Sequence, residues 1–254
     1  MNFYGAAEED TADIYQSLLQ VREMFDKVGT PSFFGDNMCA IGRNMAFARD
    51  QKFMTAFQDN ARDVADENKM WRLHTYCWAG RSALDLPGDF VECGVFHGFY
   101  SAILLQYLDF AAVGKRMYLF DTFRGLHEKY STDEERASVG NAYALGADWH
   151  EEVRARFASY SNVDVIKGLV PDVLAETSPE RIAFLHLDMN AGAAEVGALE
   201  VLFDRVVDGG LVLMDDYGRC ENSELHYALN TWMTAHAHPI LELPTGQGLV
   251  IKRK

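Results

Sequence analysis

The spacing of hydrophobic residues divides the chain into two parts that meet near residue 87. Between residues 10 and 28, apolar side chains recur every three or four positions, which predicts an amphipathic helix. They are Ile14, Leu18, Val21 and Phe25. A Gly-Thr-Pro break follows at 29–31, and further helical stretches are predicted at 43–59 and 60–84. We therefore expect residues 1–86 to form a helical N-terminal extension, which either covers the functional site as a lid or pairs two subunits into a homo-oligomer.

From residue 87 onward, short apolar runs alternate with amphipathic segments. The runs occupy residues 90–93, 117–120, 163–166, 182–187 and 211–214. Short apolar strands interleaved with helices predict a parallel sheet that is covered on both faces. Near the end of the chain, residues 239–243 and 249–251 flank a Pro-Thr-Gly-Gln-Gly turn and predict an antiparallel last strand. Residues 87–254 are thus predicted to form one α/β domain with a Rossmann-like sheet.

One connection in this domain is unusually long. The stretch from Arg124 to Tyr160 exceeds an ordinary link between a strand and a helix. Long connections in compact domains usually serve a function, such as covering an active site. We expect this stretch to contribute to a substrate lid.

Composition and charge narrow the range of partners. The 254 residues carry 23 Lys and Arg against 38 Asp and Glu, a formal charge of −15, and the one basic run is residues 252–254. Nucleic acid and membrane surfaces are not expected as partners, because both require clustered cations. No apolar stretch approaches about 20 residues, and the first residues lack the pattern of a signal peptide. With four scattered cysteines, a cytoplasmic protein is expected.

A glycine-rich turn follows the first predicted strand, in residues 92–98 with the sequence Glu-Cys-Gly-Val-Phe-His-Gly. Gly94 and Gly98 allow the backbone to approach a ligand closely, and the helix that begins near residue 99 offers free N–H groups. The middle glycine of the dinucleotide-binding pattern is missing, which disfavours a nicotinamide-dependent oxidoreductase. Glu92 suits a ligand with an amino group, such as S-adenosylmethionine. A purely structural tight turn is the alternative.

An acidic residue, Asp121, closes the second predicted strand. A carboxylate at this position can accept hydrogen bonds from both hydroxyls of an adenosine ribose. Capping of a following helix is the alternative role. The glycine turn and Asp121 both lie at carboxyl ends of strands, where α/β sheets bind ligands. Together they favour a ligand site.

Three further acids end the fourth and fifth predicted strands. Asp188 follows one strand, and Asp215 and Asp216 follow the next. Neighbouring parallel strands would bring these carboxylates to one edge of the sheet, where like charges repel unless a cation intervenes. Oxygen ligands alone favour a hard cation, Mg²⁺ above all. A solvated Asp-Asp turn is the alternative.

Four segments, taken together, resemble the macrocin O-methyltransferase family. They are residues 87–95, 120–126, 187–190 and 215–218, and they occur in the family's order. The resemblance covers about residues 87 to 254. It implies the class I methyltransferase fold, in which a parallel sheet is closed by an antiparallel last strand. It also implies Mg²⁺-dependent transfer of a methyl group from S-adenosylmethionine to a hydroxyl of a sugar or glycoside.

The resemblance also assigns roles to residues. It implies that the end of the first strand and the turn after it hold the methionine moiety, and that the end of the second strand holds the ribose. The resulting cofactor set is Glu92, Gly94, Val95, Phe96, Gly98, Ser101, Asp121, Thr122 and Phe123. The metal set is Asp188, Asp215 and Asp216, with Asp188 also in the catalytic role.

The chain departs from the family's pattern after the fourth strand. The antibiotic enzymes typically carry Asp-x-Asp-Leu-Tyr-Glu, whereas here the second acid is Asn190 and the Tyr and Glu positions hold Gly192 and Ala193. Asn cannot act as a general base, so Asp188, a metal-bound hydroxide or bulk water would have to replace that acid. A cofactor-binding protein of the same fold without catalysis is therefore the alternative function.

Overall fold

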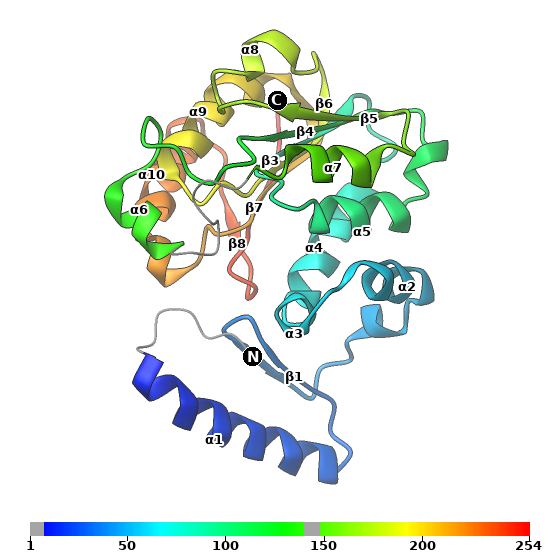
Figure 1. Cartoon of the computed structure of the whole chain (residues 1–254), viewed down its shortest axis with the longest axis vertical. Helices are drawn as coiled ribbons and strands as arrows, with labels where there is room; N and C mark the ends of the chain where they lie inside the picture. Colours follow the sequence, from blue (N-terminus) through cyan, green and yellow to red (C-terminus); the bar gives the residue numbers. More distant parts are fainter. Residues whose placement is uncertain (1–7, 140–147) are drawn as a thin grey trace.

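The computed structural model describes residues 8–139 and 148–254 and is built around a seven-stranded sheet (Figure 1). In spatial order the strands are β5 (Val163–Lys167), β4 (Met117–Asp121), β3 (Asp89–Cys93), β6 (Ile182–Leu187), β7 (Val206–Met214), β9 (Gly248–Ile251) and β8 (Leu241–Glu242). The first five are parallel, and β9 runs antiparallel to both β7 and β8. The predicted parallel sheet with an antiparallel end is confirmed.

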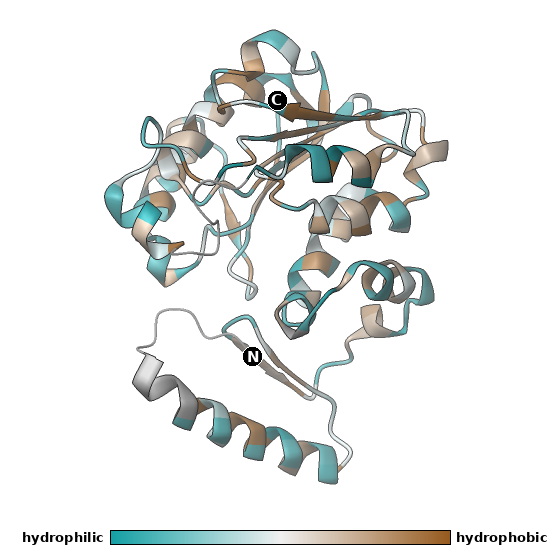
Figure 2. Cartoon of the chain, in the orientation of Figure 1, coloured by the Kyte–Doolittle hydropathy of each residue, from teal (hydrophilic) through white to brown (hydrophobic). Residues whose placement is uncertain are grey.

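Helices cover both faces of the sheet and enclose two hydrophobic cores. One core includes side chains of α2 (Gln51–Asn60), α4 (Met70–Ser82), α5 (Phe99–Tyr107) and α7 (His150–Phe157). The other includes side chains of α8 (Leu174–Thr177), α9 (Gly192–Leu202) and α10 (Ser223–Ala235). All six residues of β6 are buried, as expected for a central parallel strand with two covered faces. Figure 2 shows the strands as mostly hydrophobic ribbons.

The N-terminal part is less purely helical than expected. The first helix, α1 (Glu8–Lys27), matches the prediction, but a hairpin of β1 (Ser32–Gly35) and β2 (Met38–Ile41) follows it. Asp36 and Asn37 form its turn with φ of 52° and 56°, the left-handed geometry that joins twisted strands tightly. The hairpin was missed because its strands are only four residues long, too short for a clear period. In Figure 1, α1 and β1 lie at one end of the molecule.

The predicted third helical stretch is divided in two. The short helix α3 (Val64–Glu67) precedes α4, in which Leu73, Tyr76 and Cys77 are buried among residues of the sheet's core. This helix contacts α5 and β7. Although it precedes residue 87, α4 is therefore part of the packing that supports the sheet.

The long connection after β4 contains two helices, α6 (Asp133–Ser138) and α7. Val153 and Phe157 of α7 are buried in the core, so this helix belongs to the layer that covers the sheet. Residues 125–127 and 130–131 instead line a pocket. Part of the expected substrate lid, residues 140–147, lies outside the described residues. None of the helices that the structure describes is both long and apolar enough to cross a membrane.

Candidate functional site

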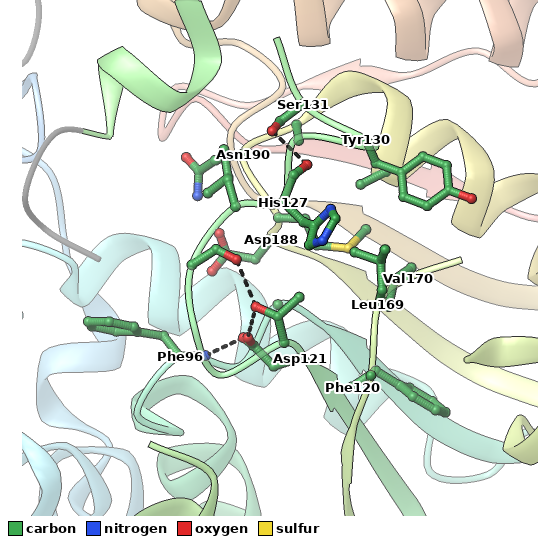
Figure 3. A pocket seen from close by; sticks show the side chains of 18 of the residues that line it. Phe96, Phe120, Asp121, His127, Tyr130, Ser131, Leu169, Val170, Asp188 and Asn190 are labelled. Carbon is green, nitrogen blue, oxygen red and sulfur yellow. Dashed lines mark hydrogen bonds between the residues drawn. The ribbon is translucent and has the colours of Figure 1, made fainter. Parts of the chain in front are cut away.

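A pocket opens at the carboxyl ends of β3, β4 and β6, where the sequence predicted a ligand site (Figure 3). It encloses about 690 Å³, part of which is open to solvent. The predicted site residues on its wall are Gly94, Phe96, Asp121, Thr122 and Asp188. Residues 125–127 and 130–131 and Trp149 also line it, and they belong to the long connection that was expected to contribute to a substrate lid. The rest of the wall includes residues 168–170 and 189–191.

The turn after β3 requires glycine for steric reasons. Gly94 has a φ of 92°, and a Cβ atom there would lie 1.8 Å from the carbonyl oxygen of Asp188. Gly98 has a φ of 73°, and a Cβ there would lie 2.6 Å from the ring of Phe157. Both glycines let the turn pass close to β6 and α7, so the backbone of residues 94–96 can form one wall of the pocket.

Asp121 holds this turn in place. Its Oδ2 accepts hydrogen bonds from the backbone N–H groups of Val95 at 2.6 Å and Phe96 at 2.8 Å, and its Oδ1 accepts one from Phe123 at 2.6 Å. Burial raises the pKa of Asp121, although these donors favour the charged form. The carboxylate therefore joins the ends of β3 and β4 and also reaches the pocket wall, as Figure 3 shows.

Other predicted cofactor residues lie behind the wall. The carboxylate of Glu92 accepts hydrogen bonds from Tyr76 at 2.9 Å and from Ser101, and its Oε1 lies 3.4 Å from Nδ1 of His186. Glu92 is buried because alternate residues of β3 face opposite sides of the sheet, which directs its side chain toward α4 and α5. The side chains of Val95 and Phe123 are buried in the core, and Gly98 begins α5.

The three acids predicted as metal ligands converge. Asp188 follows β6 and Asp215 follows β7, two neighbouring parallel strands in which Leu187 pairs with Met214. One carboxylate oxygen from each of Asp188, Asp215 and Asp216 lies within 4.8 Å of the others. We call these three residues the acidic centre. The predicted convergence at one sheet edge is confirmed.

Asp188 is the member of the acidic centre that reaches the pocket. It lines the wall beside Asn190 (Figure 3), whereas Asp215 and Asp216 are buried behind it. Among the described residues, none donates a hydrogen bond to the Asp188 side chain. Burial, together with the charges of Asp215 and Asp216, raises its pKa well above the ordinary range. Within residues 8–139 and 148–254, Asp188 thus has no cationic side chain as a direct partner.

A buried arginine from α4 contacts the other two acids. The Nε of Arg72 donates to Asp36 at 2.5 Å, and NH1 donates to Asp215 at 2.5 Å and to Asp216 at 3.1 Å. Arg219 lies 3.2 Å from the second oxygen of Asp36. The hairpin turn is therefore connected to the functional site. The one local signal for Arg72 is a cation among the apolar residues Met70, Trp71 and Leu73, which indicates a buried partner.

His186 connects the acidic centre to Glu92. This residue, the one polar side chain of β6, lies 3.4 Å from Glu92 through Nδ1 and 3.7 Å from Asp215 through Nε2. Burial lowers its pKa, but the neighbouring carboxylates of Asp215 and Glu92 outweigh burial and raise the pKa to about 10. These acids therefore favour the cationic form of His186.

Negative charge is in excess in this network. Among the described residues, six carboxylates gather here, and three cationic side chains lie among them. The acids are Asp36, Glu92, Asp188, Asp215, Asp216 and Glu221, and the cations are Arg72, His186 and Arg219. Oxygen donors within 4.8 Å of one another and a surplus of negative charge both fit a hard divalent cation. The residues present thus suit Mg²⁺.

The segment after Asp188 is held by acids that sequence reasoning missed. Oε1 of Glu195 accepts a hydrogen bond from the N–H of Met189 at 3.1 Å, and burial raises the pKa of Glu195 to about 8. Glu135 of α6 accepts one from the N–H of Gly192 at 2.7 Å. A Cβ at Gly192 would lie 3.2 Å from the Cα of Leu225. Glycine at this position therefore permits the close packing of α9 on α10.

Comparisons with solved structures support the fold. The O-methyltransferase NovP superposes with a TM-score of 0.63 at 21% identity, covering 73% of this chain and 81% of that one. The calicheamicin methyltransferase CalS11 gives a TM-score of 0.59 at 17% identity, covering 82% of this chain and 93% of that one. The chain therefore has the fold of class I methyltransferases.

Comparisons of sequence identify the family. A tetracenomycin 4′-O-methyltransferase from Streptomyces olivaceus is 32% identical over 154 residues, which span 56% of this chain and 58% of that enzyme. The demethyldecarbamoylnovobiocin O-methyltransferase of Streptomyces niveus is 26% identical over 180 residues, which span 62% of this chain and 68% of that enzyme. The family model of macrocin O-methyltransferase (TylF) matches residues 49–239. The match covers most of the chain, which thus belongs to the macrocin O-methyltransferase family.

Proposed function

We propose that this protein transfers a methyl group from S-adenosylmethionine to a hydroxyl of a sugar or of a sugar-bearing natural product. The observation that carries the proposal is the pocket in which Asp121 and the Gly94 turn lie next to Asp188. Family membership supports methyl transfer. The Streptomyces olivaceus relative is named for methylation of a rhamnosyl-tetracenomycin, which supports a sugar-bearing acceptor.

The glycine turn and the end of β4 would hold the cofactor. The backbone of residues 94–96 admits the methionine part because Gly94 carries no side chain there. Asp121 has lone pairs beyond those used by the turn and would accept the ribose hydroxyls. The apolar wall at Leu169 and Val170 suits the flat adenine ring. Glu92 would act indirectly, since it fixes the position of β3 through Tyr76 and His186.

The acidic centre would hold Mg²⁺, and such an ion, when bound, lowers the pKa of a hydroxyl and orients it. Asp188 faces the pocket and would place the acceptor oxygen opposite the methyl group of the cofactor. In the transfer, the acceptor oxygen would form a bond to the methyl carbon while the bond from that carbon to sulfur breaks and leaves its electron pair on sulfur. The hydroxyl proton would pass to Asp188 or to bulk water. Positioning of this kind can lower the activation free energy by about 7–11 kcal/mol.

The charge of the chain supports a small-molecule acceptor. A formal charge of −15 disfavours phosphate backbones, so we expect no nucleic acid in the reaction. We also propose the cytoplasm as its location, which is consistent with the four free cysteines. Exposed apolar side chains on α1 and directly after it, such as Met24 and Val28, fit an N-terminal extension that pairs two subunits.

The test is a methyl-transfer assay with S-adenosylmethionine, Mg²⁺ and a panel of rhamnosides and nucleotide-linked deoxysugars. We expect formation of S-adenosylhomocysteine with at least one acceptor, and loss of turnover in EDTA that added Mg²⁺ reverses. Equal turnover in EDTA would contradict the metal role and leave methyl transfer standing. Cofactor binding without turnover across the panel would favour the alternative function, a cofactor-binding protein without catalysis.

Asn190 is the observation that favours this alternative, because it replaces an acid of the family's pattern. We expect Asn190→Asp to change turnover by less than about tenfold, since Asp188 already presents a free carboxylate beside it. Steady-state kinetics of the variant on the best acceptor of the panel measure this. A gain of about a hundredfold or more would instead indicate a site that has lost its catalytic base.

A further inference from the structure

We propose that Arg72 is a permanent cation of the acidic centre. It pairs with Asp215, so that a divalent ion would bind to Asp188 and to the free oxygen of Asp216. The inference rests on the metal role proposed above and assigns unequal parts to the three acids. Arg72 comes from α4, which precedes the first strand of the large sheet, and it contacts both acids that follow β7. It therefore acts on the centre as a positioning residue.

Asp215 has little capacity left for a metal ion. Its Oδ2 accepts hydrogen bonds from Arg72 at 2.5 Å and from Tyr100 at 3.4 Å. Its Oδ1 accepts one from Gln247 at 2.7 Å and lies 3.7 Å from Nε2 of His186. A carboxylate offers about four acceptor positions, and hydrogen bonds use three of them. An ion could bind Asp215 without displacing a donor only at the one position left on Oδ1, which faces the ring of His186.

The other two acids are differently placed. The contacts of Asp216 with Arg72 at 3.1 Å and with Arg219 at 3.6 Å both involve Oδ1, and no donor from the described ranges reaches Oδ2. Asp188 accepts no hydrogen bond from the same residues through either oxygen, and it lines the pocket. The oxygens of the centre that no described donor reaches thus belong to Asp188, which lines the pocket, and to Asp216, which is buried behind it.

The guanidinium group of Arg72 is held in place by its contacts. Its side chain is 4% exposed, and Asp36 at the tip of the hairpin holds Nε while the acids hold NH1. Its helix neighbour Leu73 is fully buried, which anchors this turn of α4. Release of the guanidinium would leave an unpaired charge in the interior, which is costly. The arginine cannot move aside when an ion arrives, so its positive charge opposes the ion.

The experiment measures Mn²⁺ binding by electron paramagnetic resonance in the parent protein, Arg72→Met and Arg72→Lys. We expect Arg72→Met to bind Mn²⁺ at least about tenfold more tightly, because a repelling charge is removed and Asp215 is freed. Arg72→Lys keeps the charge and should stay within about threefold of the parent. Affinity for S-adenosylhomocysteine, measured by calorimetry, controls for folding. Equal or weaker Mn²⁺ binding by a folded Arg72→Met protein would overturn the proposal.

A second comparison applies if Arg72→Met does not fold. Asp188→Asn and Asp215→Asn make the same change at two members of the centre. We expect the first to weaken Mn²⁺ binding at least about tenfold more than the second. Equal losses would overturn the unequal assignment. Absence of Mn²⁺ binding in the parent, with S-adenosylhomocysteine still bound, would overturn both the metal role and this inference and leave the cofactor assignment intact.

Discussion

Replacement of Asp188 by Asn should reduce methyl transfer by about a thousandfold or more while cofactor affinity changes little. Asp188 is the acid of the centre that reaches the pocket. The isosteric amide keeps the shape of the side chain but removes the charge that would hold the ion and the acceptor. Both the single-turnover rate and the calorimetric affinity for S-adenosylhomocysteine should be measured. The prediction is that the rate falls and the affinity does not.

Asp204→Asn is the matched control for this variant. It makes the same change at an exposed turn between α9 and β7 and should leave turnover unchanged. Retention of more than a tenth of the parent rate in Asp188→Asn would mean that Asp188 neither holds the metal nor positions the acceptor. A parallel loss of cofactor affinity would point instead to a collapsed pocket.

Asp121→Ala should weaken binding of S-adenosylhomocysteine by about a hundredfold. The change removes the acceptor expected to bind the ribose. It also releases the N–H groups of Val95 and Phe96, which hold the glycine turn against β4 at 2.6 and 2.8 Å. Both effects act on the cofactor side of the pocket. Calorimetric titration of the purified variant measures the loss directly.

Asp164→Ala serves as the control for Asp121→Ala. Asp164 lies on the neighbouring strand β5 and pairs with Arg116 at 2.7 Å near the surface. Its loss should leave cofactor affinity within about twofold of the parent, because exposed pairs contribute little. If Asp121→Ala also stays within that range, the ribose is not bound at the end of β4.

The sheet could be predicted because its strands are encoded locally. The runs that became β4, β6 and the end of β7 are nearly uninterrupted apolar segments, as strands buried on both faces require. The acids after β6 and β7 converge as expected, since parallel neighbours end at one edge. The turn at Gly94 was also recognisable, because glycine is required there by a contact with the backbone of residue 188.

The network behind the pocket could not be predicted, because it depends on contacts between distant segments. Arg72 and Asp215 are 143 residues apart, and nothing local to either of them indicates the pair. Glu92 was expected in the pocket, but the pleat of β3 directs its side chain toward α4. The place of the hairpin beside the site was hidden for the same reason, since its tip residue Asp36 is buried by contacts with the distant Arg72 and Arg219.

Calorimetric titration of the purified protein with S-adenosylhomocysteine, first with Mg²⁺ and then with EDTA, tests the cofactor assignment on which every proposed role depends. We expect one molecule to bind per chain with a Kd in the micromolar range. Asp121 and the Gly94 turn would provide that affinity in either buffer, since neither belongs to the acidic centre. Absence of binding in both buffers would contradict the cofactor assignment and the catalytic roles proposed for this pocket.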